Sequence, residues 1–185
     1  DVDYAEFKRL LGRPPTYIGG PPVEMDKKEQ DELDDILALV KSEVKLYDER
    51  EGVVSIEIKD TNRPDLWGIE GLARALRGFL NVAKGLKKYT VGEPIVDVYV
   101  DSRLSNIRPF MGCAIVKNVK LTDTIIRGLM HLQDKLDQTY GRNRQKTSIG
   151  LYDHSLIAPP LNYTVAKPDE ISFIPLGYEE KMNLG

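Results

Sequence analysis

The chain has 185 residues, of which 41% are hydrophobic and 30% charged, a balance that excludes an intrinsically disordered protein and leaves room for one ordinary domain or two small ones. No apolar run approaches the ~18–20 residues of a membrane helix, and with one cysteine (Cys113) and no secretory signal at residues 1–4 we expect a cytoplasmic protein. The net charge of −3 argues against a general nucleic-acid binder.

The N-terminal third predicts helices arranged around a hairpin. Apolar residues at helical spacing predict a helix over residues 4–11, with the following glycine as its C-cap, and a second helix over residues 31–40 with an acidic first turn. The segment between them, residues 12–22, is too rich in glycine and proline for regular structure. Alternating apolar residues over 44–58 predict a hairpin that turns at Glu51-Gly52.

A third helix is expected to start near Pro64, and a linker rich in lysine, glycine and proline follows at residues 84–94. Beyond the linker, a helix is predicted over residues 122–140, with a glycine after it as its stop. The expected extended segments are residues 95–100, 114–119, 147–152, 161–166 and 171–174. We therefore expect an α+β fold with two domains, residues 1–90 and residues 91–185.

Charge divides the chain into two unlike parts. Residues 1–60 hold 9 basic and 16 acidic residues, whereas residues 61–185 hold 17 basic and 13 acidic residues. A solvated acidic helix beside an ordinary domain would explain this division. In functional terms, only the second part is suited to facing RNA phosphates.

Residues 60–74 form the most specific local motif, a strand-to-helix turn built on Asn-Arg-Pro-Asp. Proline suits the first turn of a helix because its φ is near the helical value and it has no N–H to lose. Asp65 is expected to accept hydrogen bonds from free backbone N–H groups there, and Asn62 to close the preceding turn. Arg63, Glu70 and Arg74 are expected to form a structural ion-pair set, and Trp67 is expected to pack between the two domains. The structural signature comprises Asn62, Arg63, Pro64, Asp65, Glu70 and Arg74.

Four later segments follow this motif in a fixed order. They are an acidic strand leading to Ile-Arg-Pro-Phe, a Leu-Gln-Asp-Lys-Leu helix, a basic turn before Ile-Gly-Leu-Tyr-Asp, and Phe-Ile-Pro-Leu-Gly-Tyr, at residues 101–116, 132–136, 141–153 and 173–178. In order and spacing, the five motifs resemble the N-terminal part of the β subunit of phenylalanyl-tRNA synthetases of the archaeal and eukaryotic type. The resemblance implies a small helix and hairpin domain followed by an incomplete mixed α/β domain of the tRNA-editing type.

The resemblance also implies partners and chemistry of the whole enzyme. Members of this family are (αβ)₂ heterotetramers, in which the α subunit uses ATP and Mg²⁺ to activate phenylalanine and transfers it to tRNA(Phe). The β subunit supports assembly and tRNA binding, and its editing domain hydrolyses tyrosine wrongly attached to that tRNA, because an apolar pocket rejects one added hydroxyl poorly. The family builds most of the editing pocket downstream, and Gly150 stands where bacterial members have a histidine. We therefore expect no catalytic residue, cofactor or metal site in this fragment.

Arg142, Arg144 and Lys146 are the candidate tRNA-binding residues. They follow the end of the helix predicted over residues 122–140. In a strand that starts early, their alternation would direct all three charges one way, toward phosphate. Cations placed at the negative end of a helix dipole are the alternative explanation. The two histidines and the one cysteine of the chain have no metal-ligand spacing.

Two other functions are compatible with parts of the pattern. A free-standing hydrolase related to the editing domain would deacylate mischarged tRNA in trans, but it would not need the N-terminal signature motif. A non-catalytic module for tRNA or protein interaction would not need the full order of motifs. The absence of an initiator methionine and the abrupt end indicate a fragment of a longer protein, and several hundred further residues in the uncut reading frame would favour the synthetase subunit.

Overall fold

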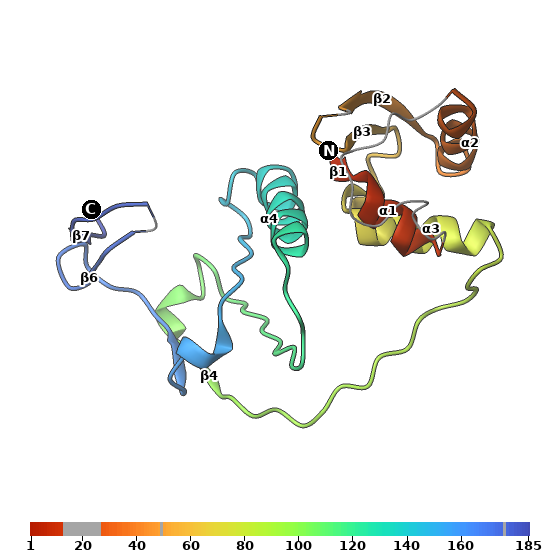
Figure 1. Ribbon diagram of the computed structural model, residues 1–185. Coiled ribbons are helices and arrows are strands. Elements are labelled where there is room, and N and C mark those ends of the chain that lie inside the picture. The colour runs from red at the N-terminus through yellow and green to blue at the C-terminus, as the bar shows by residue number, and fades with distance from the viewer. Residues whose placement is uncertain (13–26, 49, 176) are drawn as a thin grey trace. The chain divides into compact units, whose positions relative to one another are not determined.

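The computed structural model describes residues 1–12, 27–48, 50–175 and 177–185. The chain divides into two compact units, called here unit 1 (Asp1–Tyr89 with Lys120–Gly150) and unit 2 (Thr90–Val119 with Leu151–Gly185). Helices and small sheets make up a mixed α+β protein, so the predicted fold class is confirmed (Figure 1). The irregular segment expected after Gly12 lies outside the described residues.

Unit 1 contains a three-stranded antiparallel sheet in the order β1-β3-β2, made of β1 (Val2–Asp3), β2 (Ser42–Asp48) and β3 (Val53–Ile58). β2 and β3 form the predicted hairpin, with Asp48 opposite Val53. Gly52 has a φ of 63°, in the left-handed region that glycine adopts without strain. In this order β2 is an edge strand.

A ladder of charged side chains crosses the hairpin. It consists of Glu43 and Lys45 on β2, Glu57 on β3, and Lys59, which directly follows β3. Lys45 pairs with Glu43 and with Glu57, the latter at 2.9 Å, and Lys59 Nζ lies 2.7 Å from Glu43 Oε2. Hydrogen bonds from Lys45 and Lys59 lower the pKa of Glu43 to about 2. Glu43 therefore stays ionised throughout the physiological pH range.

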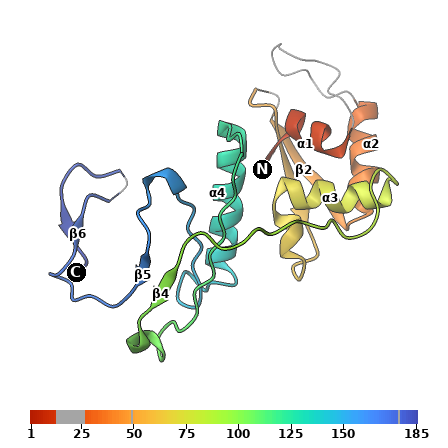
Figure 2. The same ribbon diagram turned by 90° about the horizontal axis from the view of Figure 1, so that it is seen from below.

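Three helices enclose the core of unit 1. α1 (Tyr4–Leu11) follows Asp3, whose carboxylate accepts a hydrogen bond from the Glu6 N–H at 2.8 Å, and Gly12 ends it with a φ of 81°. α2 is Lys27–Ala38 and α3 is Ile69–Phe79, and the helices gather with the hairpin in both Figure 1 and Figure 2. The buried core side chains are Phe7, Leu11, Leu33, Ile36, Leu37, Val40, Val54, Leu66, Ile69, Leu72, Ala73 and Leu76.

Two of the helix predictions need correction. α2 extends back to Lys27, so the acidic run at residues 31–35 occupies its middle and not its first turn. The expected third helix is interrupted: η1 (Pro64–Trp67) is a 3₁₀ turn, and Gly68 then adopts an extended conformation with φ −116° and ψ 152°. This extended residue redirects the chain so that α3 folds back onto the turn that precedes it.

α4 (Asp123–Gln138) confirms the helix predicted after the linker. Thr122 caps it through a 3.3 Å hydrogen bond that its Oγ1 accepts from the Ile125 N–H. The strands predicted over 114–119 and 147–152 are wrong, since neither segment has strand structure. A strand requires a partner with which to share its backbone hydrogen bonds, and apolar alternation alone does not supply one.

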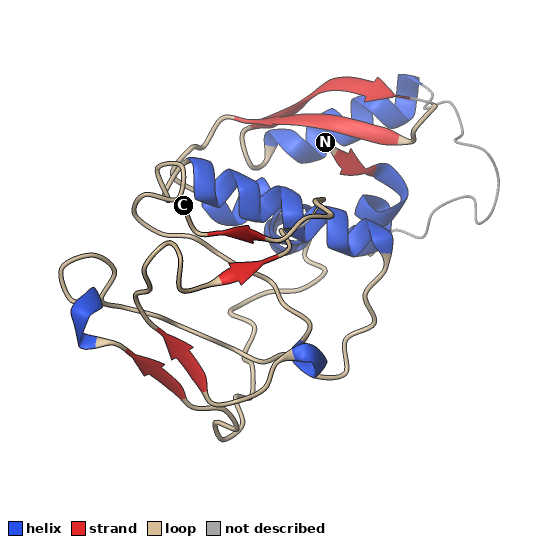
Figure 3. Ribbon diagram, turned by 90° about the vertical axis from the view of Figure 1, so that its left-hand side faces the viewer, coloured by secondary structure: helices blue, strands red, loops and turns tan. Residues whose placement is uncertain are grey.

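Unit 2 contains two short strand pairs and is otherwise mostly loop, as Figure 3 shows. β4 (Val98–Val100) pairs in parallel with β5 (Leu161–Tyr163), and β6 (Ser172–Phe173) pairs antiparallel with β7 (Met182–Asn183). Short 3₁₀ turns lie at Ser102–Leu104 and His154–Leu156. Three of the predicted extended segments therefore contain strands, each shorter than expected. The division into family domains at residue 90 remains a prediction.

Candidate nucleic-acid interface

The three candidate tRNA-binding residues lie in a closed turn after α4, called here the basic turn (residues 139–149). The Gly141 N–H donates to the Leu136 carbonyl at 2.9 Å, and the Lys146 N–H donates to the Gly141 carbonyl at 2.8 Å. Arg142, Asn143 and Arg144 have φ values of 48°, 54° and 65°, so all three adopt the left-handed conformation. The prediction of an early strand with alternating charges is therefore wrong, because three consecutive residues with positive φ are incompatible with an extended strand.

Gly141 is the residue that allows the turn to close. A Cβ at this position would lie 2.4 Å from the Asp137 carbonyl oxygen and 2.6 Å from the Thr147 carbonyl oxygen. Both obstacles are backbone atoms, which no side-chain rotation can move. Gly141 therefore does more than end the helix, as expected. Because it has no side chain, the backbone at Asp137 and at Thr147 can approach it closely.

Asp137, on the last turn of α4, is hydrogen-bonded to the middle of the basic turn at Arg144 and to its end at Ile149. Its side chain is 3% exposed, accepts a hydrogen bond from the Ile149 N–H at 3.0 Å and receives the Arg144 Nε at 2.9 Å. Arg144 also lies 3.7 Å from the Asp134 carboxylate. Arg144 is thus paired with two carboxylates. Since α4 has several acidic residues, the sequence pattern alone could not identify these two as its partners.

Arg142 and Lys146 have a different environment from Arg144. All three cations are exposed, but within the described residues neither Arg142 nor Lys146 makes an ion pair. A shallow depression of about 180 Å³ beside them is lined by Asp134, Asp137, Gln138, Asn143 and Arg144. Since two carboxylates line it, this depression is a poor site for an anion. Arg142 and Lys146 are therefore the cations of the turn that have no carboxylate partner among the described residues.

The signature motif also forms a charged cluster, in which Asp65 takes the place expected for Glu70. Arg63 donates hydrogen bonds to the Asp65 carboxylate from Nε and Nη2, both at 2.8 Å. Arg74 Nη2 lies 3.9 Å from the same carboxylate. The hydrogen bond from Arg63 holds the pKa of Asp65 below its usual range. Glu70 makes no ion pair among the described residues, and neither η1 nor α3 has a capping hydrogen bond from a side chain. Asp65 therefore pairs with Arg63, and its expected capping role remains a prediction.

The signature motif contacts α4 within unit 1. The rings of Trp67 and Tyr140 have centroids 5.8 Å apart. Gly68 lies against Leu132, whose nearest carbon would be 3.3 Å from a Cβ on that glycine. These contacts join the segment that carries the signature to the helix that carries the basic turn, so both candidate regions belong to one compact unit.

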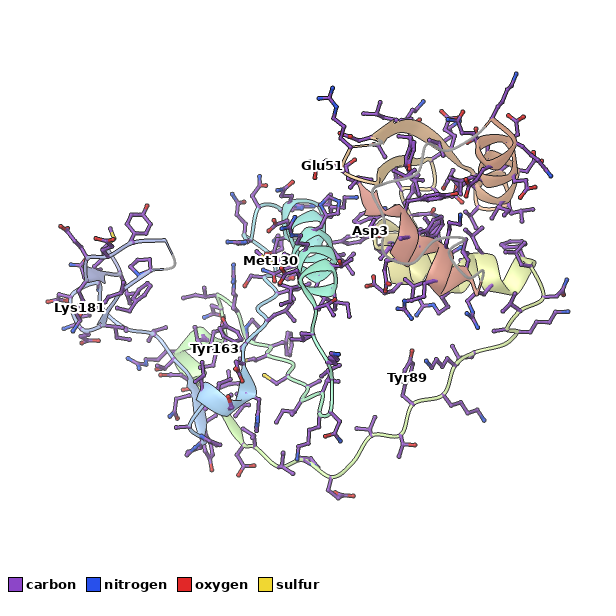
Figure 4. All side chains as sticks on the ribbon, viewed as in Figure 1. Asp3, Glu51, Tyr89, Met130, Tyr163 and Lys181 are labelled. Carbon is purple, nitrogen blue, oxygen red and sulfur yellow. The ribbon has the colours of Figure 1, made fainter. Side chains whose placement is uncertain are left out.

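Unit 2 has a polar cluster that the sequence reading missed. Asp101 accepts hydrogen bonds from Arg103 Nη2 at 2.6 Å and Thr164 Oγ1 at 2.8 Å, and these partners hold the pKa of Asp101 well below its usual range. The cluster lies beside a cavity of about 380 Å³ lined by residues of β4 and β5, including Tyr163, which Figure 4 labels. The short Asp-x-Arg spacing was the available signal, but Thr164 lies sixty-three residues away.

The remaining candidate chemistry is sparse. Over the described ranges, no group of three or more histidine, cysteine or acidic residues is placed to hold a metal ion. Burial, and then the charge of Lys135, lowers the pKa of His131, and Cys113 is an exposed free thiol. No described helix combines the length and the apolar composition needed to cross a membrane.

Comparison with known proteins adds an independent line of evidence. No protein-family model matches the chain. Over its whole length, the chain is 40% identical to the phenylalanine–tRNA ligase β subunit of Pyrococcus furiosus and 39% identical to that of Thermococcus onnurineus. It spans 31% and 30% of the lengths of these two curated relatives.

A solved structure is similar in both sequence and fold. It is the crystal structure of an N-terminal fragment of the phenylalanyl-tRNA synthetase β subunit from Pyrococcus horikoshii, with a TM-score of 0.85 and 37% identity. The match covers 99% of this chain and 49% of that fragment. Similarity in sequence therefore extends to similarity in fold over almost every residue.

Proposed function

Because the chain belongs to the family of phenylalanine–tRNA ligase β subunits and corresponds to an N-terminal part of that subunit, we propose that it supports assembly and tRNA binding in an (αβ)₂ ligase. The observation that carries the proposal is the 40% identity along the whole chain, joined to a TM-score of 0.85 with an N-terminal β-subunit fragment. The chain spans less than a third of the relatives' length, so the activity of the whole enzyme extends well beyond these residues.

In this proposal, the chain itself contributes no chemical step. ATP and Mg²⁺ act in the α subunit, where phenylalanine is activated and joined to tRNA(Phe). The removal of wrongly attached tyrosine takes place in the editing domain, of which residues 91–185 supply the first part. The lack of a metal-binding group among the described residues is compatible with this division of labour. The task left to this chain is to hold and orient RNA and neighbouring parts of the enzyme.

We place the tRNA contact on the basic turn. Its sequence from Thr139 to Ile149 has three cations and no acidic residue, and it lies in the part of the chain that has a basic excess. RNA affinity depends mainly on cations that meet phosphates and release bound counterions. The exposure of Arg142 and Lys146 supports this role, as does the polar character of their neighbours Asn143 and Gln145.

The test uses the full β subunit assembled with its α subunit. In the variant R142E/K146E, tRNA(Phe) binding should weaken and its salt dependence should fall by about one unit of slope for each lost phosphate contact. The matched control is K27E/K28E, which changes the net charge equally at exposed positions on the acidic side of the chain. Binding by R142E/K146E that equals binding by the control at every salt concentration would remove the proposed contact.

Aminoacylation and deacylation of Tyr-tRNA(Phe) should be measured on the same preparations. A weaker tRNA contact should raise the KM for tRNA in both reactions, while kcat changes little, because no reacting atom is touched. A loss of the α subunit from the preparation would instead indicate that this region acts chiefly in assembly. The two measurements therefore separate RNA contact from subunit contact.

A further inference from the structure

Asp137 is a buried carboxylate with an unusual set of partners. Its side chain is 3% exposed, and it accepts from a backbone N–H twelve residues later, that of Ile149, at 3.0 Å. Its second oxygen receives Arg144 Nε at 2.9 Å. A buried carboxylate is tolerated only when it is paired and hydrogen-bonded, and these two contacts supply both kinds of partner.

The backbone of Asp137 takes part in the same closure. Its carbonyl oxygen accepts a hydrogen bond from the Arg144 N–H at 3.2 Å and lies where a side chain on Gly141 would fall. Asp137 thus accepts hydrogen bonds from both the middle and the end of the basic turn. Three consecutive left-handed residues, which cost free energy individually, persist when surrounding contacts over-determine them.

This closure divides the three cations into two classes. Arg144 has a side chain that is 61% exposed, but it lies beside two carboxylates, Asp137 at 2.9 Å and Asp134 at 3.7 Å, so its charge is partly compensated. Arg142 and Lys146 occupy the positions two residues on either side of Arg144 and stand in solvent. Along the turn, Arg144, which is paired with carboxylates, therefore separates Arg142 from Lys146, which have no such partner among the described residues.

We infer that Asp137 is a positioning residue that commits Arg144 to the structure of the basic turn and leaves Arg142 and Lys146 to bind RNA phosphates. The inference rests on the proposed tRNA contact and specifies which groups make it. A turn fixed in advance loses little conformational entropy when RNA binds, so the two exposed cations bind more tightly than they would on a mobile loop. An acidic protein segment would be a different partner, and RNA is favoured because guanidinium and ammonium groups beside the Asn143 and Gln145 amides match phosphate and sugar oxygens.

The experiment compares four substitutions in the assembled enzyme: R142Q, K146Q, R144Q and D137N. For each, the dissociation constant of tRNA(Phe) is measured across a salt series, and hydrogen exchange is measured in the peptide that covers residues 139–149. R142Q and K146Q should each lower the salt slope by about one unit and leave exchange unchanged. R144Q and D137N should leave the slope nearly unchanged but speed exchange and weaken binding severalfold at any one salt concentration.

A double variant, D137N/R144Q, tests whether the pair acts as a unit. Its loss of binding should be clearly smaller than the product of the two single losses, because each single change already breaks the same contact. Asn at position 137 keeps an oxygen for the Ile149 N–H, so this variant is expected to fold where a change to alanine would risk unfolding the turn.

Different results overturn different statements. A fall of about one unit in slope for R144Q would show that Arg144 binds phosphate and would overturn the inference, while the proposed tRNA contact would stand. Unchanged affinity and slope in R142Q and K146Q would overturn the tRNA contact and the inference together. Competition by polyglutamate as strong as that by tRNA, at equal charge, would overturn the choice of RNA as the partner.

Discussion

Gly71→Ala is the substitution with the sharpest structural expectation. An added Cβ would lie 1.6 Å from the carbonyl oxygen of Asp65 and 2.7 Å from its carbonyl carbon, whereas real Cβ contacts essentially never fall below 3.0 Å. The obstacle is backbone, so the η1 turn would have to move away from α3 and take the buried Leu66 with it. Overpacking of this kind costs roughly 3 kcal/mol or more, against ~1 kcal/mol gained from the helix propensity of alanine. A net loss of about 2 kcal/mol follows.

Gly78→Ala on the same helix is the matched control. Its Cβ would meet only the Ala83 carbonyl oxygen at 3.9 Å, an ordinary contact, so this change should leave stability unchanged or raise it by up to ~1 kcal/mol. Thermal unfolding would be followed in an N-terminal fragment equivalent to the one crystallised from Pyrococcus horikoshii. Two glycines in one helix should then differ clearly in their effect on Tm. An unfolding temperature for G71A equal to or above that of G78A would refute the reasoning from the close approach.

Two further predictions concern the signature motif. Tyr140→Ala should destabilise the fragment by about 1 kcal/mol through loss of the aromatic pair with Trp67, whereas Tyr178→Ala in unit 2 should have little effect; equal shifts in Tm would contradict this. Asp65 has a lowered pKa, so the stability that it contributes is present above its unfolded pKa of roughly 3.9 and is lost as pH falls through the lower folded value. Asp65→Asn should therefore flatten the decline in urea midpoint below about pH 4, and an unaltered decline would indicate that other carboxylates cause it.

Sequence patterns predicted those elements whose causes are local. α1 and its Gly12 cap, the hairpin at Glu51-Gly52 and α4 after Thr122 depend on helical periodicity, turn chemistry and capping within a few residues. The resemblance drawn from five ordered motifs is confirmed by relatives that match the whole chain. Order and spacing of motifs carry this information because they are preserved across a fold even where individual contacts differ.

Features that depend on tertiary contacts were not predictable from the sequence. The expected strand over 114–119 has the right alternation, but it lacks a pairing partner, and Val116 remains 73% exposed. Arg144 has several acidic neighbours along the chain. Its ion pair with the buried Asp137 became visible only in the structure. The pairing of Asp101 with Thr164 joins residues too distant in sequence for spacing to reveal. In the candidate site, the residues were therefore found, but their division of roles was not.

The charge ladder on the hairpin has a consequence for how the molecule behaves among its own copies. An edge strand such as β2 presents backbone groups on which a strand from another molecule can form a continuing sheet. Such an intruder would have to sit beside Lys45 and Glu43, and to do so it would need to strip water and partners from groups that stay ionised across the pH range of a cell. Addition of a strand from another copy to this edge of the sheet is therefore unfavourable.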